Sequence, residues 1–321
     1  MLSIENLKTT FHTPKGVCYA VNNVSFKIDN TETLGIVGES GCGKSVTALS
    51  IMRLIPDPPG KIDGKISFEG KEVLALSRAE MVQIRGDRVS MIFQEPMTSL
   101  NPVFTIGNQI SEAIQLHQRL GKRESMGKTI EMLGRVGIPA PEKRISDYPH
   151  QLSGGMRQRA MIAMALACHP RLLIADEPTT ALDVTIQAQI LDLMRKLQQE
   201  LNMAIMFISH DLGVIAEMAS RVLVFYAGKI VESGEALEIF SHPQHPYTRG
   251  LLQSVLTVDH GRQKPRRRLP EISGTVPDLF HLPNGCKFSP RCSFAKSICH
   301  QEDPPWREWT SDHFTACWLD S

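Results

Sequence analysis

A run of glycines followed by lysine and serine is the stretch of this sequence with the clearest chemistry. Residues 38–45 read GESGCGKS, which fits the pattern G-x-x-x-x-G-K-[ST], and the apolar run LGIV precedes them. A strand, a glycine-rich loop and a helix in this order let backbone N–H groups surround an anion at the helix N-terminus. Lys44 would reach the β- and γ-phosphates, and the Ser45 hydroxyl would bind Mg²⁺. The stretch therefore predicts a site for a nucleoside triphosphate.

Polar residues also stand at the ends of two apolar runs. Gln94 follows RVSMIF, and Asp176 and Glu177 follow RLLIA. Open α/β sheets bind ligands at the carboxyl ends of their strands. Asp176 would hold the hydration shell of Mg²⁺, and Glu177 would polarise the attacking water. Gln94 would contact the Mg²⁺ ion or the attacking water. The alternative for each residue is a polar cap that only ends its strand.

Two further residues could touch a nucleotide. His210 follows the apolar run MAIMFIS and could donate a hydrogen bond to the γ-phosphate, although a polar cap is the simpler interpretation. Tyr19 lies on an expected strand before the phosphate loop and could stack on adenine, where an aromatic contact contributes about 1–3 kcal/mol by analogy with base stacking. A half-buried strand tyrosine is the alternative.

A second glycine pair opens another expected helix. Ser153, Gly154 and Gly155 stand in the stretch LSGGMRQR, and a serine with two glycines at a helix start offers a second preformed anion site. An ordinary helix N-cap is the alternative. One chain would then hold two anion sites and one complete phosphate loop, which suggests that the two sites meet across a dimer. Asp183 lies in the turn after Glu177.

Length and composition narrow the possible classes of protein. The chain has 321 residues, and 35 Lys and Arg face 34 Asp and Glu, a balance that argues against a dedicated nucleic-acid binder. Its first residues lack the basic and apolar regions of an export signal, and its apolar runs are shorter than the roughly 18 residues that span a bilayer. We expect a cytosolic protein or one peripheral to a membrane, in which the seven cysteines form no disulfides.

The order of expected elements predicts an α/β protein. Short strands with alternating polarity over residues 2–37 predict an antiparallel β subdomain beside the phosphate loop, and helical periodicity over about 95–165 predicts an α-helical subdomain. Further strands are expected over 88–93, 171–176 and 203–209, a long helix over 184–201, and a hairpin over 221–232. A boundary near residue 235 separates a nucleotide-binding domain, 1–235, from an extension, 236–321.

Taken in order, these motifs resemble the nucleotide-binding subunit of an ATP-binding cassette (ABC) transporter. The resemblance covers residues 2 to about 235, and LSGGMRQR is the stretch that separates this family from other phosphate-loop ATPases. It implies a RecA-like core that binds ATP and Mg²⁺. The resemblance also implies the roles of the site residues. Adenine would stack on Tyr19, the phosphates would be bound by Gly38, Ser40, Gly41, Gly43, Lys44 and Ser45, and Mg²⁺ would be bound by Ser45, Gln94 and Asp176. The catalytic residues would be the base Glu177 together with His210, Gln94 and Lys44, and the residues that contact ATP bound to the partner of a dimer would be Ser153, Gly154, Gly155 and Asp183.

Beyond residue 235 the chain resembles the extension of ATPases that serve dipeptide, oligopeptide and nickel importers. The stretches FSHPQHPYTRGLL, GTVPDL and GCKFSPRC carry the likeness. It implies ATP-driven uptake of dipeptides or oligopeptides, with the chain on the cytoplasmic side of the membrane. The implied partners are a second, different ATPase that forms a heterodimer with this chain, two membrane permeases and an external peptide-binding protein. Nickel or antimicrobial-peptide import is the alternative; a soluble ABC ATPase acting on nucleic acid or ribosomes would be expected to carry a long insert or a second cassette.

Four cysteines crowd into the end of the chain. Cys286, Cys292, Cys299 and Cys317 are spaced C-x5-C-x6-C-x17-C, wider than the knuckles of structural zinc sites. Four thiolates can hold a 4Fe–4S cluster, and relatives of this ATPase are similar in carrying one. The tail also has little apolar sequence to fold around. The spacing therefore predicts a structural 4Fe–4S cluster, with zinc as the alternative.

Overall fold

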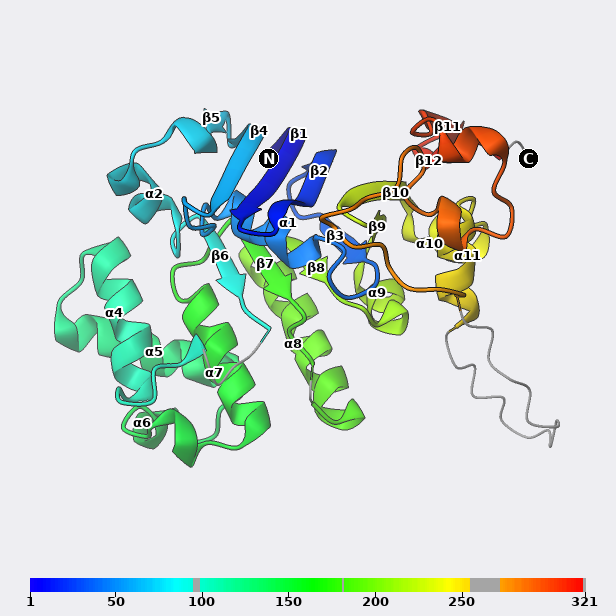
Figure 1. Cartoon of the computed structure of the whole chain (residues 1–321). Coiled ribbons are helices and arrows are strands. Elements are labelled where there is room, and N and C mark those ends of the chain that lie inside the picture. The colour runs from blue at the N-terminus through cyan, green and yellow to red at the C-terminus, as the bar shows by residue number, and fades with distance from the viewer. Residues whose placement is uncertain (95–98, 181, 255–271, 320–321) are drawn as a thin grey trace, which may run out of the picture. The chain divides into compact units, whose positions relative to one another are not determined.

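The computed structural model describes residues 1–94, 99–180, 182–254 and 272–319 (Figure 1). The chain forms two compact units. The first unit contains Met1–Leu2, Ile28–Thr33 and Ser67–Ile208. The second contains Ser3–Lys27, Leu34–Ile66 and Ser209–Ser321. The chain therefore passes between the two units several times, and each of them joins segments that are far apart in the sequence.

A parallel sheet forms the centre of the first unit. Strand β7 (Leu172–Asp176) lies between β6 (Val89–Ile92) and β8 (Ala204–Ile208), and both pairings are parallel. Every residue of the three strands is buried, as expected of parallel strands that are covered on both faces and therefore apolar throughout. The strands expected here are confirmed. Their carboxyl ends lie along one edge, which is where Gln94 and Glu177 follow their strands.

Helix α8 (Val184–Leu201) follows the acidic strand end in the same unit. It buries the stripe Ile190, Leu191, Met194 and Leu197, a spacing of three and four residues that places these side chains on one face. Asp183 caps the helix, since its Oδ1 accepts a hydrogen bond from Ile186 N at 2.9 Å. The short elements of the unit are β5 (Lys71–Glu72), a 3₁₀ turn (Val73–Ala75) and α2 (Arg78–Ile84).

Helices fill most of the stretch between β6 and β7. They are α4 (Ile106–Gln118), α5 (Lys122–Arg135), α6 (Pro141–Arg144), a 3₁₀ turn (Pro149–Gln151) and α7 (Gly154–Leu166). Helix α4 buries Ile106, Ile110 and Ile114 at four-residue spacing, and it packs against α5 and α7 (Figure 1). The helical character predicted for this stretch is confirmed. Its first residues, 95–98, lie outside the described part of the chain.

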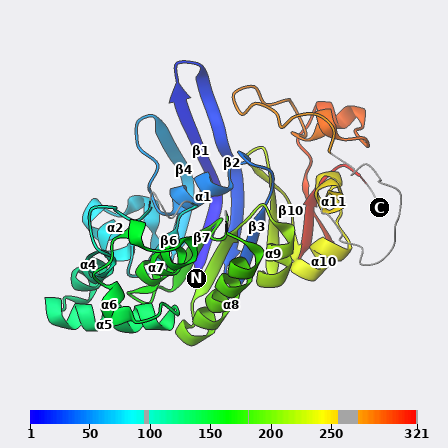
Figure 2. The same ribbon diagram turned by 90° about the horizontal axis from the view of Figure 1, so that it is seen from below.

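The second unit contains two groups of strands. In the first group β1 (Leu2–Thr13) lies between β2 (Gly16–Ile28) and β4 (Gly60–Phe68), as Figure 2 shows. In the other, β3 (Thr33–Val37) pairs in parallel with β9 (Arg221–Tyr226), which pairs antiparallel with β10 (Lys229–Glu235). Helices α1 (Lys44–Ile51) and α9 (Leu212–Met218) also belong to this unit. Helix α9 lies so close to β3 that a Cβ on Gly35 would meet Ile215 Cγ2 at 2.8 Å.

The C-terminal extension continues this second group of strands. It contains α10 (Ala236–Ser241), α11 (Pro246–Gln253), two 3₁₀ turns (Ser289–Arg291 and Ser297–His300), β11 (Trp306–Thr310) and β12 (His313–Ala316). Strand β12 pairs antiparallel with both β10 and β11. The rings of Tyr226, Tyr247 and Phe288 pack against one another, with centroids 4.6–5.4 Å apart. The extension therefore shares an apolar centre with β9.

Glu232, on β10, is a fully buried carboxylate surrounded by donors from the extension. It accepts hydrogen bonds from Gln244 N at 2.6 Å and His245 N at 3.0 Å, and His313 Nε2 lies 2.8 Å from it. His245 caps α11, because its Nδ1 accepts a hydrogen bond from Tyr247 N at 3.1 Å. A buried charge is costly unless hydrogen bonds satisfy it, so this cluster ties β10, β12 and the start of α11 together.

We predict that His245 makes the fold sensitive to acid. Burial lowers the pKa of His245 from its ordinary value of 6.5 to about 4, so below pH 6.5 the unfolded chain binds a proton that the folded chain excludes. The stability from this residue is present above pH 6.5 and is lost as the pH falls to about 4, up to about 3 kcal/mol in all. Urea unfolding at pH 7, 5.5 and 4.5 measures the loss. His245→Asn keeps a capping oxygen and should show less of it; an identical pH dependence in both chains would refute this assignment.

The predicted 4Fe–4S cluster is wrong, and the zinc alternative is not supported either. In the described ranges no group of three or more His, Cys, Asp or Glu side chains is arranged to hold a metal ion. Cys286, Cys292, Cys299 and Cys317 are free thiols. Burial raises the pKa of Cys286 to about 11, which favours the neutral thiol over the thiolate that a metal needs. The prediction assumed that the tail lacks a core, whereas the aromatic cluster and the buried Glu232 supply one.

Candidate nucleotide site

The predicted phosphate loop connects β3 to α1 in the second unit. Gly38, Gly41 and Gly43 have φ values of 151°, 76° and 103°, and residues other than glycine rarely adopt these backbone conformations. Two of them also lie against backbone: a Cβ on Gly38 would meet Phe225 O at 2.3 Å, and one on Gly43 would meet Ala20 O at 2.3 Å. The loop and the first turn of α1 are therefore fixed by the strands around them.

Lys44 begins helix α1 and lies over this loop. The residue is only 5% exposed, and its Nζ donates hydrogen bonds to Gly38 O at 2.7 Å and Glu39 O at 3.0 Å. The ammonium group is thus held at the start of the loop, where it can meet phosphate oxygens. Ser45 follows it in the first turn of α1. Burial raises the pKa of the neighbouring Cys42 thiol, so this residue stays neutral and acts as a spacer in the loop.

Tyr19 and His210 are the other predicted site residues of the second unit. Tyr19 is half-buried on β2, and Lys8 Nζ lies 5.0 Å from its ring centroid. A cation over one face of the ring is compatible with a base stacked on the other. His210 is exposed, two residues before the start of α9. The next residue, Asp211, caps that helix by accepting hydrogen bonds from Gly213 N at 2.9 Å and Val214 N at 3.3 Å.

The acidic strand end lies in the first unit, and the structure brings Gln94 to it. Asp176 is the last residue of β7 and is buried. Glu177 follows with a φ of 49°, a left-handed conformation that is strained for a residue with a side chain. Gln94 Nε2 donates to Glu177 Oε2 at 3.0 Å, and Thr180 Oγ1 donates to the same oxygen at 2.9 Å. Two neutral donors therefore orient the carboxylate of Glu177.

Thr180 is a contact that the motifs did not single out, and we predict that it positions Glu177. Thr180→Val removes the hydroxyl at nearly constant volume, so the carboxylate of Glu177 loses this donor. We expect kcat for ATP hydrolysis to fall by about tenfold with little change in KM, because Thr180 orients the carboxylate and is not expected to bind the nucleotide. Steady-state hydrolysis measures both constants. Thr180→Ser keeps the donor and should keep most of the rate; equal losses in both variants would contradict this role.

The second glycine pair opens α7 in the same unit. Ser153 is the N-cap of this helix, and its hydroxyl accepts a hydrogen bond from Met156 N at 3.4 Å. Gly154 and Gly155 form the first turn, and a Cβ on Gly155 would lie 3.1 Å from Ile186 Cγ2. Ile186 is also the residue that donates its N–H to Asp183. The start of α7 and the start of α8 are thus neighbours.

Comparison with known proteins identifies the class to which these features belong. A family profile described as ABC transporter matches residues 21–180, and another described as oligopeptide/dipeptide transporter, C-terminal region, matches residues 231–299. The oligopeptide transport ATP-binding protein OppD of Bacillus subtilis is 51% identical over 320 residues, which are 99% of this chain and 88% of that protein. The dipeptide transport ATP-binding protein DppD of the same organism is 50% identical, over 99% of this chain and 94% of that protein.

The fold agrees with these relatives. A dimeric ATP-binding cassette solved in a post-hydrolysis state with ADP and phosphate has a TM-score of 0.66 and 28% identity to this chain, covering 74% of it and 99% of that cassette. The fold is therefore that of a phosphate-loop ATPase with mixed sheets. The chain belongs to the ABC transporter family of ATP-binding proteins and is an ATPase of that family. It carries the C-terminal region typical of the oligopeptide and dipeptide transporters.

Proposed function

We propose that this chain is the ATP-hydrolysing subunit of an importer that carries dipeptides or oligopeptides across the cytoplasmic membrane. The observation that carries the proposal is the match of residues 231–299 to the oligopeptide/dipeptide transporter C-terminal region. Relatives named for peptide transport match over nearly the whole chain, which supports it. The extension is also an integral part of the second unit, through β12 and the buried Glu232. Residues 1–235 would be the nucleotide-binding domain with its RecA-like core, and 236–321 the extension.

ATP would bind at the phosphate loop. Its phosphates would accept hydrogen bonds from backbone N–H groups of the loop and meet the Lys44 ammonium, while Tyr19 would stack on adenine. The positive φ values of the loop glycines support this role, because they let backbone N–H groups face an anion. The residues assigned to binding are Gly38, Ser40, Gly41, Gly43, Lys44, Ser45 and Tyr19.

Hydrolysis would need a base, a metal and a hydrogen-bond donor to the γ-phosphate. Glu177 would take the proton of the attacking water as that water bonds to the γ-phosphorus and ADP leaves. Asp176, Ser45 and Gln94 offer the oxygen ligands that Mg²⁺ prefers. Gln94 donates to Glu177 through Nε2, so its amide oxygen is the atom suited to the metal. His210 would donate to the γ-phosphate.

A second ATPase subunit would complete each site. Ser153, Gly154 and Gly155 at the start of α7 would meet the γ-phosphate held by the partner subunit, with Asp183 beside them. A helix of 13 residues with no acidic residue in its first turn suits this role, because its N-terminal N–H groups favour an anion. Whether the second subunit is identical or different does not alter the chemistry.

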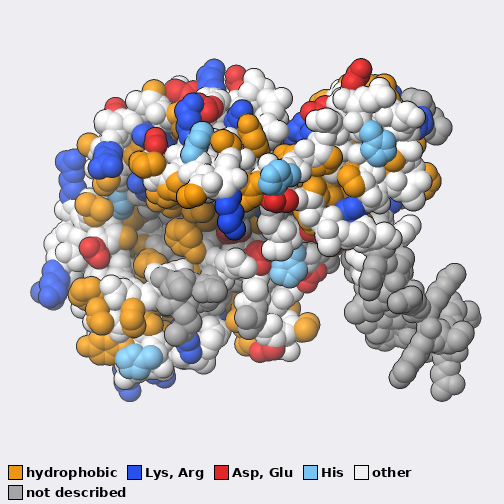
Figure 3. Space-filling view, in the orientation of Figure 1, with side chains coloured by type: hydrophobic (Ala, Val, Ile, Leu, Met, Phe, Trp, Pro, Cys, Tyr) orange, Lys and Arg blue, Asp and Glu red, His pale blue; other side chains and the backbone are white. Residues whose placement is uncertain are grey.

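Two membrane permeases would receive the force of ATP binding. None of the helices in the described ranges combines the length and apolar character that crossing a bilayer requires. By the likeness to peptide-transport ATP-binding proteins, the chain would bind to the permeases as a peripheral subunit on the cytoplasmic side. Apolar side chains lie over α4 to α6 on the face drawn in Figure 3, and the large exposed ones of this region include Val103, Phe104, Leu116 and Tyr148. An external peptide-binding protein would deliver the substrate, and no nucleic acid would take part.

The experiment that tests this function is ATP hydrolysis by the complete assembly. The chain is co-purified with its permeases and with the external binding protein, and hydrolysis is measured with a dipeptide, an oligopeptide or Ni²⁺ added to the binding protein. We expect a peptide to stimulate hydrolysis severalfold and Ni²⁺ to have no effect. Stimulation by Ni²⁺ alone would favour the nickel importer and contradict peptide import.

A further inference from the structure

Glu39, the residue after Gly38 in the phosphate loop, is held through all three of its polar groups. Its N–H donates to Tyr247 Oη at 2.8 Å, and its carbonyl accepts the hydrogen bond from Lys44 at 3.0 Å. Its carboxylate accepts two hydrogen bonds from Arg291, at 2.6 Å from Nη1 and 3.0 Å from Nη2. Tyr247 and Arg291 both belong to the extension, 208 and 252 positions further along the chain. Within the second unit, the extension therefore contacts the loop directly.

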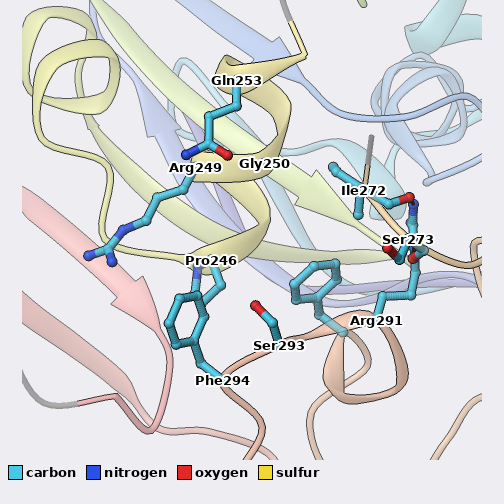
Figure 4. Close-up of a pocket in the computed structure, with 10 residues that line it drawn as sticks. Pro246, Arg249, Gly250, Gln253, Ile272, Ser273, Arg291, Ser293 and Phe294 are labelled. Carbon is cyan, nitrogen blue, oxygen red and sulfur yellow. Dashed lines mark hydrogen bonds between the residues drawn. The ribbon is translucent and has the colours of Figure 1, made fainter. Parts of the chain in front are cut away.

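Arg291 is itself fixed by the segments around it. Its side chain is only 4% exposed. Nε donates to Ser273 O at 3.0 Å and Nη2 donates to Ile272 O at 3.3 Å. Figure 4 shows Arg291 beside Ile272 and Ser273, on the wall of a cavity that Arg249 and Phe294 also line. The hydrogen bonds from Arg291 to Glu39 raise the pKa of the guanidinium above its ordinary value. A guanidinium that donates two hydrogen bonds to one carboxylate fixes the position of that carboxylate and favours its charged form.

Because Glu39 is negatively charged, its pairing with Arg291 should affect the binding of ATP. A carboxylate one residue after Gly38 lies in the loop that has to accept a polyphosphate, and like charges at such a short range repel each other. Arg291 compensates the Glu39 charge in a part-buried setting, where water screens little. Glu39 also carries the carbonyl that Lys44 contacts, so a displaced Glu39 would disturb the lysine that meets the phosphates.

We propose that Arg291 and Tyr247 are positioning residues for ATP. Arg291 neutralises Glu39, and both residues hold the first half of the phosphate loop in its binding conformation. The extension thereby determines ATP affinity, in addition to any role in assembly. Neither residue is expected to touch the reacting atoms, so ATP binding should change while the rate constant of hydrolysis at saturating ATP is largely kept.

The test compares four full-length variants by calorimetric titration with Mg-ATP and by steady-state hydrolysis. Arg291→Gln leaves the Glu39 carboxylate unpaired, and we expect Kd and KM for ATP to rise by about tenfold. The double variant Arg291→Gln/Glu39→Gln removes the unpaired charge as well, and Kd should return to within about threefold of the original value. Tyr247→Phe keeps the ring but removes the acceptor of Glu39 N, and Kd should rise severalfold. Asp303→Asn is the control, because Asp303 pairs with Lys229 and Lys287 at the extension without contacting the loop.

A purely structural role for Arg291 predicts a different pattern. If Arg291 only stabilised the extension, the double variant would bind ATP no better than Arg291→Gln, and Asp303→Asn would weaken binding similarly; either result overturns the proposal. An unchanged Kd in Arg291→Gln overturns it as well. If Arg291→Gln does not fold, Tyr247→Phe decides: a severalfold rise in Kd with an unchanged melting temperature supports the proposal, and an unchanged Kd overturns it.

Discussion

Replacing Glu177 with glutamine should abolish ATP turnover and leave ATP binding intact. The introduced amide keeps the size of the side chain, and its oxygen can still accept the hydrogen bonds from Gln94 and Thr180. It cannot accept a proton from the attacking water. Since general base catalysis contributes about 10²–10⁴-fold, we expect kcat to fall by about 10³-fold. Hydrolysis of radiolabelled ATP measures the loss, and calorimetric titration measures the binding that remains.

The control for this prediction is a glutamate outside the site. Glu131 on α5 pairs with Arg135 at the surface, and Glu131→Gln should leave kcat unchanged because such exposed pairs contribute little. If Glu177→Gln kept turnover within a fewfold of the original chain, the base would have to be another residue. If it lost ATP binding together with turnover, Glu177 would be a binding residue.

Replacing Lys44 with alanine should remove ATP binding itself. The ammonium is positioned by Gly38 O and Glu39 O, and hydrogen bonds between a charged donor and phosphate are among the stronger ones in proteins. Loss of about 3 kcal/mol would raise Kd by more than about 100-fold. Titration with Mg-ATP measures Kd, and thermal unfolding without nucleotide shows whether the chain still folds.

Lys27 supplies the matched control for this charge. It lies on β2 with an exposed side chain, so Lys27→Ala removes one positive charge from the same unit without touching the phosphate loop. We expect its Kd to remain within about twofold of the original value. A chain with Lys44→Ala that folded and still bound ATP with near-original affinity would contradict the assignment of this loop.

Patterns local in the sequence were sufficient to predict the strands and helices that carry the candidate site. The run RLLIA is apolar after its first residue because β7 is buried on both faces, and the polar residues Asp176 and Glu177 stand where burial ends. The same reasoning placed Gln94 after β6. Parallel pairing of these strands explains why Gln94 and Glu177 meet, although they are 83 positions apart.

Contacts set by the tertiary fold were not predictable in this way. Nothing in the local sequence distinguishes Arg291 from other arginines, and its partner Glu39 lies 252 positions away. Thr180 was missed because a threonine in a turn has an ordinary local role. The wrong prediction of a 4Fe–4S cluster has a related cause. The four cysteines were assigned to a cluster partly because the sequence of the tail suggested no apolar core. The side chains that build this core, Tyr226 and Tyr247, come from β9 and α11.

The central claim is that ATP hydrolysis by this chain drives uptake of peptides, and uptake by whole cells tests it most directly. Cells that lack the chain are complemented with the original chain or with Glu177→Gln, and the entry of a radiolabelled dipeptide and of radioactive Ni²⁺ is measured. We predict that the original chain restores peptide uptake, that Glu177→Gln does not, and that nickel uptake is the same in all strains. Peptide uptake restored equally by Glu177→Gln, or restoration of nickel uptake alone, would contradict the claim.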